Sequence, residues 1–195
     1  TTFGPLEFNI RAVKPADLIE LVDVLANSFH PQTGLTRWLF PLLRLGIYED
    51  FRQRLRSFHS PDYTCLVAVA SSQNAPQVLG TVEVALRPTY FFLISSNPHP
   101  YLSNLAVDAN HRRQGIAQNL LLACERIVVE RGYHDLYLHV LENNQPAKQL
   151  YFKAGYQVQN AEPVWCSWFL HRPRRLLLHK SLPDAPGQDL RTLSC

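Results

Sequence analysis

The sequence predicts a mixed α/β (α+β) fold, a single domain with one central sheet of about seven strands, two of them splayed, and about four helices around it. Three observations predict it. Segments with apolar residues at every second position alternate with segments in which they recur every three or four. Hairpin-like pairs of strands lie on either side of a strand–helix–strand unit at residues 101–140. The 195 residues are 46% apolar and 18% charged, which suits a chain with a real core rather than a disordered one.

The expected elements follow in chain order. Alternation predicts strands at residues 8–13, 63–70, 79–87, 101–107 and 135–140. Caps and helical spacing predict helices at residues 14–29, 116–131 and 144–154. Residues 30–60 look helical in pieces broken by Pro31, Pro41 and Gly46, residues 88–100 look like a long link, and residues 164–170 and 175–182 look like a final hairpin. We expect the domain to span residues 1–183, followed by a polar tail at 184–195.

Composition excludes several classes of protein. The formal net charge of +3 is too small to favour nucleic acid as a partner. The four cysteines are far apart, so neither a disulfide framework nor a zinc site is expected. No apolar stretch is long enough for a bilayer, and no signal peptide is evident. The chain contains no methionine, so we expect an upstream segment or tag. A soluble domain of a reducing compartment is expected: cytoplasm, or plastid stroma for a plant chain.

The segment "HRRQGIA" at residues 111–117 stands where the strand at 101–107 gives way to a helix. Backbone N–H groups in the first turn of a helix have no partner inside the helix, and the helix dipole favours negative charge there. Gly115 and Ala117 leave the backbone open to close approach, while Arg112 and Arg113 add positive charge. The segment lacks the signatures of a nucleotide P-loop and of a dinucleotide fingerprint. It predicts a phosphate site of another kind, with a solvated basic turn as the alternative.

Two motifs in this part of the chain resemble those of the GCN5-related N-acetyltransferase (GNAT) superfamily. Arg112-x-x-Gly115-x-Ala117 corresponds to that family's pyrophosphate loop. The pattern N-x-x-A-x-x-L-Y-x-x-x-G, from Asn144 to Gly155, corresponds to its second cofactor element. The close resemblance covers roughly residues 80–156, and it is strongest toward plastid and cyanobacterial members and protein N-terminal acetyltransferases.

The resemblance implies acetyl-CoA as cosubstrate and no metal. The pyrophosphate would lie on the loop at 112–117, and the strands at 101–107 and 136–140 would diverge so that backbone groups of the first can bond the pantetheine amides. The cofactor-binding residues expected on this basis are Leu105, Ala106, Val107, Arg112, Arg113, Gln114, Gly115, Ile116, Ala117, Asn143, Asn144, Ala147 and Tyr151.

Attack of an amine on the thioester needs a base for the amine and an acid for the departing thiolate. By resemblance, Tyr151 is the expected acid. For the base, the "YLHV" strand puts His139 and Tyr137 on one face, and resemblance to N-terminal acetyltransferases pairs His139 with Tyr101. Glu83 on a neighbouring strand is a rival base, and solvent is a third possibility.

The expected function is therefore transfer of an acetyl group to a primary amine, at protein N-termini or lysine side chains. The alternatives are an acetyltransferase of small amines, such as an arylalkylamine, a polyamine or a drug, and a non-catalytic module that binds acetyl-CoA. The expected partners are acetyl-CoA and the amine acceptor, without a membrane, and the sequence does not predict the oligomeric state.

Overall fold

The computed structural model describes residues 7–29, 40–56, 62–70, 77–87, 90–91, 94–95, 98–163 and 173–183. The chain forms two compact units. Unit 1 consists of Thr1–Ala85 and Ser103–Cys124, and unit 2 of Leu86–Leu102 and Glu125–Cys195. Each unit is described by itself below.

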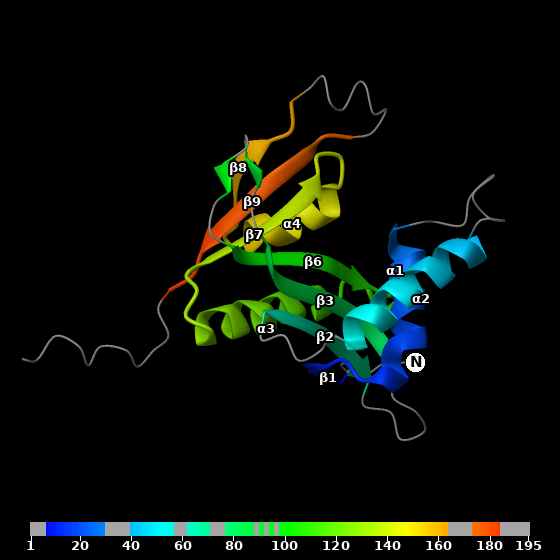
Figure 1. Ribbon diagram of the computed structural model, residues 1–195. Helices are drawn as coiled ribbons and strands as arrows, with labels where there is room; N and C mark the ends of the chain where they lie inside the picture. The colour runs from blue at the N-terminus through cyan, green and yellow to red at the C-terminus, as the bar shows by residue number, and fades with distance from the viewer. Residues whose placement is uncertain are drawn as a thin grey trace, which may run out of the picture. The chain divides into compact units, whose positions relative to one another are not determined.

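Unit 1 contains an antiparallel set of strands with two helices packed on it. Its elements are β1 (Phe8–Ala12), α1 (Leu18–Phe29), α2 (Phe40–Arg56), β2 (Tyr63–Ala70), most of β3 (Val78–Arg87), the second half of β6 (His99–Val107) and the first part of α3 (Ile116–Glu130). β1 pairs with β2 from Phe8↔Ala70 onward, and β2 pairs with β3 through Cys65↔Glu83. Helices α1 and α2 lie side by side (Figure 1).

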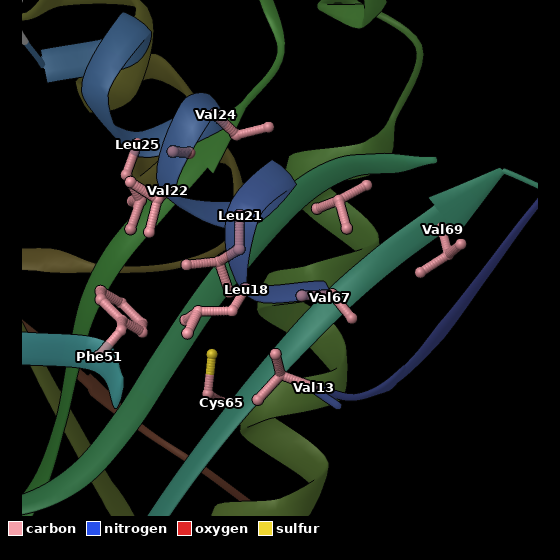
Figure 2. Close-up of a cluster of buried hydrophobic side chains, with 12 residues drawn as sticks. Val13, Leu18, Leu21, Val22, Val24, Leu25, Phe51, Cys65, Val67 and Val69 are labelled. Carbon is pink, nitrogen blue, oxygen red and sulfur yellow. The ribbon is translucent and has the colours of Figure 1, made fainter. Parts of the chain in front are cut away.

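The core of unit 1 forms because α1 carries apolar residues on one face and β2 carries them at alternate positions. Figure 2 shows this cluster, with Leu21 of α1, Phe51 of α2 and Cys65 of β2 among its buried side chains. The buried aromatic ring of Phe51, 2% exposed, ties α2 to the same core. The helix therefore has a fixed face toward the strands, which positions its polar residues as well.

Unit 2 contains the first half of β6, a strand that runs parallel to it, and two further strands that pair antiparallel with each other. Its further elements are β4 (Tyr90–Phe91), β5 (Ile94–Ser95), β7 (Asp135–Leu141), α4 (Gln145–Lys153), β8 (Gln157–Ala161) and β9 (Arg175–Ser181). Strand β9 pairs antiparallel with both β7 and β8 (Figure 1). Along β7, Leu136, Leu138 and Val140 are buried, whereas Tyr137 and His139 belong to the opposite, more open face, as the period of two predicts.

The strand order β1-β2-β3-β6-β7-β9-β8 makes one seven-stranded sheet, because β6 contributes to both units. The pairing of β6 with β7 is parallel, so the sheet is mixed. In the described residues this pairing covers two positions, Tyr101↔Tyr137 and Leu102↔Leu138. The predicted fold class, a mixed sheet of about seven strands with about four helices, is confirmed.

Several predicted element boundaries were wrong. Helix α2 runs unbroken through Pro41 and Gly46, because proline is tolerated in the first turn of a helix and the packed ring of Phe51 outweighs one glycine. The predicted link at 88–100 contains β4, β5 and the start of β6.

The predicted final hairpin has a different first strand. Strand β9 pairs with β8 at Gln157–Ala161, which the sequence analysis did not predict as a strand. The strand predicted at 164–170 and the tail predicted at 184–195 lie outside the described residues.

Gly80 of β3 sets the distance between β3, β6 and α3 in unit 1. A Cβ atom at this position would lie 2.9 Å from the Ala106 carbonyl oxygen and 3.2 Å from side-chain atoms of both Ile116 and Leu120. The absence of a side chain therefore lets the end of β6 and the start of α3 pack directly against the strand. This contact fixes the backbone that leads into the predicted phosphate loop.

Among the described residues, no helix is both long and apolar enough to span a membrane. The same part of the chain contains no cluster of three or more histidine, cysteine or acidic residues arranged to hold a metal ion. Cys65 and Cys124 are buried, and neither forms a disulfide bond.

Candidate functional site

The loop between β6 and α3 begins with a tightly hydrogen-bonded turn in unit 1. The Asp108 backbone N–H donates to the Leu79 carbonyl at 2.8 Å. The Asp108 carboxylate accepts from the Asn110 N–H at 3.0 Å and contacts His111 Nδ1 at 2.7 Å. These bonds hold the chain in a short 3-10 turn at Ala109–His111 and give the loop a defined shape before the helix begins.

The rest of the loop exposes its backbone at the start of α3. Arg113 and Gly115 adopt left-handed conformations, with φ of 65° and 80°, and the residues from Arg112 to Gly115 are exposed. Ile116 is a core residue, 1% exposed, so it can offer a ligand only its N–H group. A turn of this kind at the first turn of a helix can bind an anion through several backbone N–H groups at once.

The end of β6 is fastened to the elements around it. The Val107 carbonyl accepts from the Arg112 Nε–H at 3.2 Å and from the Ser28 hydroxyl at 3.5 Å. Arg112 therefore ties the loop to the strand, in addition to adding positive charge. Ala106 is buried, whereas Leu105 and Val107 are half-buried.

Glu83 lies in the middle of β3 and is fully buried, with 0% exposure. One of its carboxylate oxygens accepts a hydrogen bond from the Asn104 amide at 2.6 Å, and the other accepts from Arg54 at 2.8 Å. Arg54 also forms an ion pair with Asp50 one turn earlier on α2, at 2.6 Å. Both oxygens of the buried carboxylate therefore have a strong donor, as a buried charge requires.

In unit 2 the structure brings together the predicted pair Tyr101 and His139. The Tyr101 hydroxyl lies 2.8 Å from His139 Nδ1, and their rings are tilted with centroids 5.7 Å apart. Partial burial of the imidazole lowers the pKa of His139 below its usual range, and the nearby Arg175 guanidinium lowers it further. His139 is therefore neutral near pH 7 and can accept a proton while still reaching solvent.

Tyr101 keeps its proton and is held by a cation. Burial raises the pKa of the Tyr101 phenol above its ordinary value, with the Arg87 guanidinium acting in the opposite direction. Arg87 stacks over the ring at 4.9 Å from the centroid, a cation–π contact that fixes the ring plane. In the tautomer of His139 that carries its proton on Nε2, the protonated phenol donates to Nδ1, which leaves oxygen lone pairs of Tyr101 as acceptors.

The predicted general acid, Tyr151, is 7% exposed on α4 of unit 2. Its ring meets that of Tyr156 edge-on, at 5.7 Å between centroids. Burial raises the pKa of Tyr151 well above its usual range, and the proximity of Tyr101 raises it further. The phenol is therefore a proton donor rather than a base under any ordinary condition.

Helix α4 begins as the sequence predicts. The Asn144 side chain caps it by accepting from the Ala147 N–H at 3.2 Å, and Pro146 occupies the first turn. The helix ends before Gly155, which has a φ of 90°. Asn143 and Asn144 are exposed and Ala147 is half-buried, so the start of the helix is open to a ligand.

Three residues of these clusters were missed from the sequence. Arg54 lies in an aromatic and arginine-rich segment for which the sequence suggested a role in the acceptor groove, Asn104 was an ordinary strand residue, and Arg87 was the end of a strand. The available signal was Glu83 itself, because a glutamate between two valines of a buried strand needs donors from elsewhere.

The chain matches the model of the acetyltransferase (GNAT) family over residues 25–156, and it belongs to that family. The match extends across both units.

Curated relatives agree with this. The chain is 42% identical over 86 residues to GCN5-related N-acetyltransferase 7, chloroplastic, of Arabidopsis thaliana, covering 44% of this chain and 31% of that protein. It is 33% identical over 189 residues to GCN5-related N-acetyltransferase 5, chloroplastic, of the same plant, covering 89% of this chain and 59% of that protein. The chain thus spans less than two thirds of the length of these relatives.

A solved structure supports the fold. The PaiA N-acetyltransferase of Thermoplasma acidophilum, determined in complex with coenzyme A, superposes with a TM-score of 0.68 at 19% identity, covering 90% of this chain and 99% of that one. At this identity the likeness concerns the fold alone.

Proposed function

We propose that this chain is an N-acetyltransferase that transfers the acetyl group of acetyl-CoA to a primary amine of a protein, at the N-terminus or at a lysine side chain. The observation that carries the proposal is the hydrogen-bonded pair of Tyr101 and His139, in which a protonated phenol meets an imidazole of lowered pKa at 2.8 Å. Family membership supplies the reaction class, and this pair supplies a route for the proton of the amine.

Acetyl-CoA is bound in the proposal by backbone groups rather than by a charged pocket. The backbone N–H groups from Arg113 to Ala117 receive the pyrophosphate, which suits the left-handed φ of 80° at Gly115 and the helix start behind it. Backbone groups of Leu105 and Val107 bond the pantetheine amides. Asn143, Asn144 and Ala147 belong to the second cofactor element of the family motif, and the capped start of α4 supports that role.

The incoming amine gives up its proton to the pair in two linked transfers. The oxygen of Tyr101 accepts the amine proton while its own proton passes to His139 Nδ1. These two transfers leave the phenol neutral and the imidazole positively charged. The exposed imidazole of His139 then releases its proton to solvent. A neutral imidazole at physiological pH, which the lowered pKa provides, is the requirement for such a base.

Tyr151 serves the opposite end of the reaction. The amine nitrogen attacks the thioester carbonyl carbon, the C–N bond forms and the C–S bond breaks, and the sulfur leaves as a thiolate. The phenol of Tyr151 donates its proton to that sulfur or hydrogen-bonds it as negative charge develops. Its raised pKa keeps the phenol protonated, so the hydroxyl can donate a hydrogen bond to the sulfur throughout the reaction.

The proposed acceptor class follows from the weak basicity of the His139 imidazole. A peptide N-terminal amine has a pKa of about 8, whereas a lysine amine has one of about 10.4. A neutral imidazole of lowered pKa is a weak base, which suits the N-terminal amine better. The plastid is the proposed location, supported by the chloroplastic relatives, and the cytoplasm is the alternative.

The test is incubation of the purified chain with acetyl-CoA and a matched panel of acceptors, with products identified by mass spectrometry. The panel contains peptides with a free N-terminus and no lysine, the same peptides with a blocked N-terminus and one lysine, and small amines such as polyamines. Acetylated peptides in either peptide set support the proposal, and the ratio of the two sets assigns the preferred amine. Acetylation of small amines alone overturns the protein-acceptor proposal, and binding of acetyl-CoA without any product indicates a non-catalytic module.

A further inference from the structure

Strand β6 contains one residue with a positive φ, which is unusual inside a strand. Asn104 has a φ of 52°, in the left-handed region that L-residues avoid, although asparagine tolerates it better than most. Such a conformation persists only where neighbouring groups hold it. Asn104 directly precedes the segment Leu105–Val107, whose backbone is proposed to bind the pantetheine arm. The direction of that segment therefore depends on what holds Asn104.

The group that holds Asn104 is the buried carboxylate of Glu83. The Asn104 amide donates to Glu83 at 2.6 Å, a short bond to a charged acceptor of the stronger kind. The second oxygen of Glu83 accepts from Arg54 at 2.8 Å, and Arg54 is itself fixed by Asp50 on the same helix. The bonds run from α2 through β3 to the left-handed residue of β6, all within unit 1.

We propose that Glu83 is a positioning residue for acetyl-CoA and not the general base: its carboxylate holds Asn104 in the left-handed conformation and so sets the course of the Leu105–Val107 backbone. Arg54 makes this arrangement depend on helix α2. The inference builds on the proposed function, because it assigns a cause to the geometry of the segment that would bind the cosubstrate.

The contacts of Glu83 argue against the rival role. A general base must present a free lone pair to the proton that it accepts. Each oxygen of Glu83 already accepts from a strong donor. The side chain is fully buried, so its remaining lone pairs are not open to an incoming amine. Protonation would neutralise the carboxylate and weaken its hydrogen bonds from Asn104 and Arg54, so a catalytic cycle through Glu83 would loosen the support of the left-handed residue at each turnover.

The decisive variants alter the direction of one hydrogen bond. In Glu83→Gln the introduced amide has one acceptor oxygen for two donors, so either Asn104 or Arg54 loses its partner. In the double variant Glu83→Gln with Asn104→Asp, the introduced amide donates to the introduced carboxylate and its oxygen accepts from Arg54. The double variant keeps the total charge and restores both bonds, and aspartate tolerates a positive φ as asparagine does.

The matched control is Glu125→Gln. Glu125 is also a buried glutamate, 7% exposed, and it also pairs with a cation, Lys180, at 2.7 Å. It belongs to neither cofactor element nor to the tyrosine–histidine pair. Its replacement therefore reports the general cost of neutralising a buried ion pair.

Acetyl-CoA binding is measured by calorimetry, together with thermal unfolding, kcat at saturating acetyl-CoA and the pH profile of kcat/KM. We expect Glu83→Gln to weaken acetyl-CoA binding about tenfold or more, which corresponds to the loss of one hydrogen bond to a charged group. We also expect this variant to keep the acidic limb of the profile, that is, the fall of kcat/KM at low pH as His139 becomes protonated. The double variant restores binding toward the wild-type value, and Glu125→Gln binds as the wild type does. Should Glu83→Gln fold poorly, Asn104→Gly removes the same hydrogen bond. Glycine adopts the left-handed conformation and many others, so we expect the Leu105–Val107 segment to lose its fixed course and acetyl-CoA binding to weaken as in Glu83→Gln.

Two results overturn the inference. In one, Glu83→Gln binds acetyl-CoA as tightly as the wild type; in the other, its kcat collapses with the acidic limb lost and binding unchanged, which is the behaviour of a base. Failure of the proposed function is distinguishable, because the wild type itself would then not bind acetyl-CoA or would not acetylate any amine.

Discussion

Two glycines with the same backbone conformation offer a sharp test of the proposed pyrophosphate loop. Gly115 has a φ of 80° and Gly132 a φ of 79°. A Cβ atom at Gly115 would have Asn119 as its nearest neighbour, at an ordinary 3.6 Å, and one at Gly132 would have no neighbour within 4 Å. Replacement by alanine therefore causes no collision at either position, and the only intrinsic cost is the left-handed conformation itself.

That cost is about 1–2 kcal/mol for an L-residue. In a domain of this size it corresponds to a fall in Tm of roughly 2–8 °C, and we expect it from both Gly115→Ala and Gly132→Ala. At Gly115 there is a second effect. A loop that relaxes out of the left-handed conformation turns at least one N–H away from the phosphate, and one such bond to a charged group contributes about 1.5–3 kcal/mol.

Gly115→Ala should therefore bind acetyl-CoA about ten- to a hundredfold more weakly than Gly132→Ala, although the two variants lose similar stability. The assay is isothermal calorimetry with acetyl-CoA, beside thermal unfolding of each variant without ligand. The acceptor KM serves as an internal control, because it should move far less than the acetyl-CoA constant. Equal acetyl-CoA affinities in the two variants would refute the reasoning and leave the loop as a solvated basic turn.

Three further predictions concern the proton path and stability. Tyr151→Phe keeps the buried ring and loses the hydroxyl, so acetyl-CoA binding should persist while kcat falls ~10²–10⁴-fold; wild-type turnover would remove Tyr151 from the mechanism. In the wild type, kcat/KM should fall with decreasing pH at values below the ordinary histidine pKa of about 6.5, because the pKa of His139 is lowered. His139→Ala should abolish this fall. Tyr101→Phe should reduce turnover and leave acetyl-CoA binding intact. The Asp17 carboxylate accepts hydrogen bonds from Arg11 at 2.6 and 2.8 Å, and these bonds lower the pKa of the carboxyl group. The ion pair therefore stabilises the folded state fully above the unfolded pKa of about 3.9. This stabilisation is lost as the pH falls through the lower folded pKa. Asp17→Asn should accordingly cost about 1–3 kcal/mol in urea unfolding at pH 7 and progressively less in acid, and an equal cost at all pH values would contradict the assignment.

The parts of the site that the sequence predicts are those with local signals. Asn144 caps α4 through an N–H three residues away, and Gly132 ends α3 by a conformation that glycine favours. The open face of β7 follows from alternation within a single strand. In each case the residues that decide the structure stand within one helical turn or one strand of one another.

The parts that could not be predicted depend on partners far apart in the chain. The donors to Glu83 come from Arg54 and Asn104, 29 and 21 residues away, and no local pattern records them. Strand β8 was missed for a related reason, because its first three residues are exposed and lack apolar alternation; its pairing with β9 defines it. Helix α2 was divided at Gly46 because a single glycine weighs more in a local reading than in a helix anchored by Phe51.

The close approach at Gly80 has a consequence for how this protein can change by mutation. Because a Cβ at position 80 would meet the Ala106 carbonyl and the side chains of Ile116 and Leu120, substitutions at these positions should be epistatic rather than additive. A smaller residue at Leu120 would relieve one contact of a new side chain at position 80, but the Ala106 carbonyl belongs to the backbone and cannot be trimmed. A library that varies Ile116 and Leu120 while Gly80 is held fixed should therefore contain a larger fraction of folded sequences than one that also varies position 80.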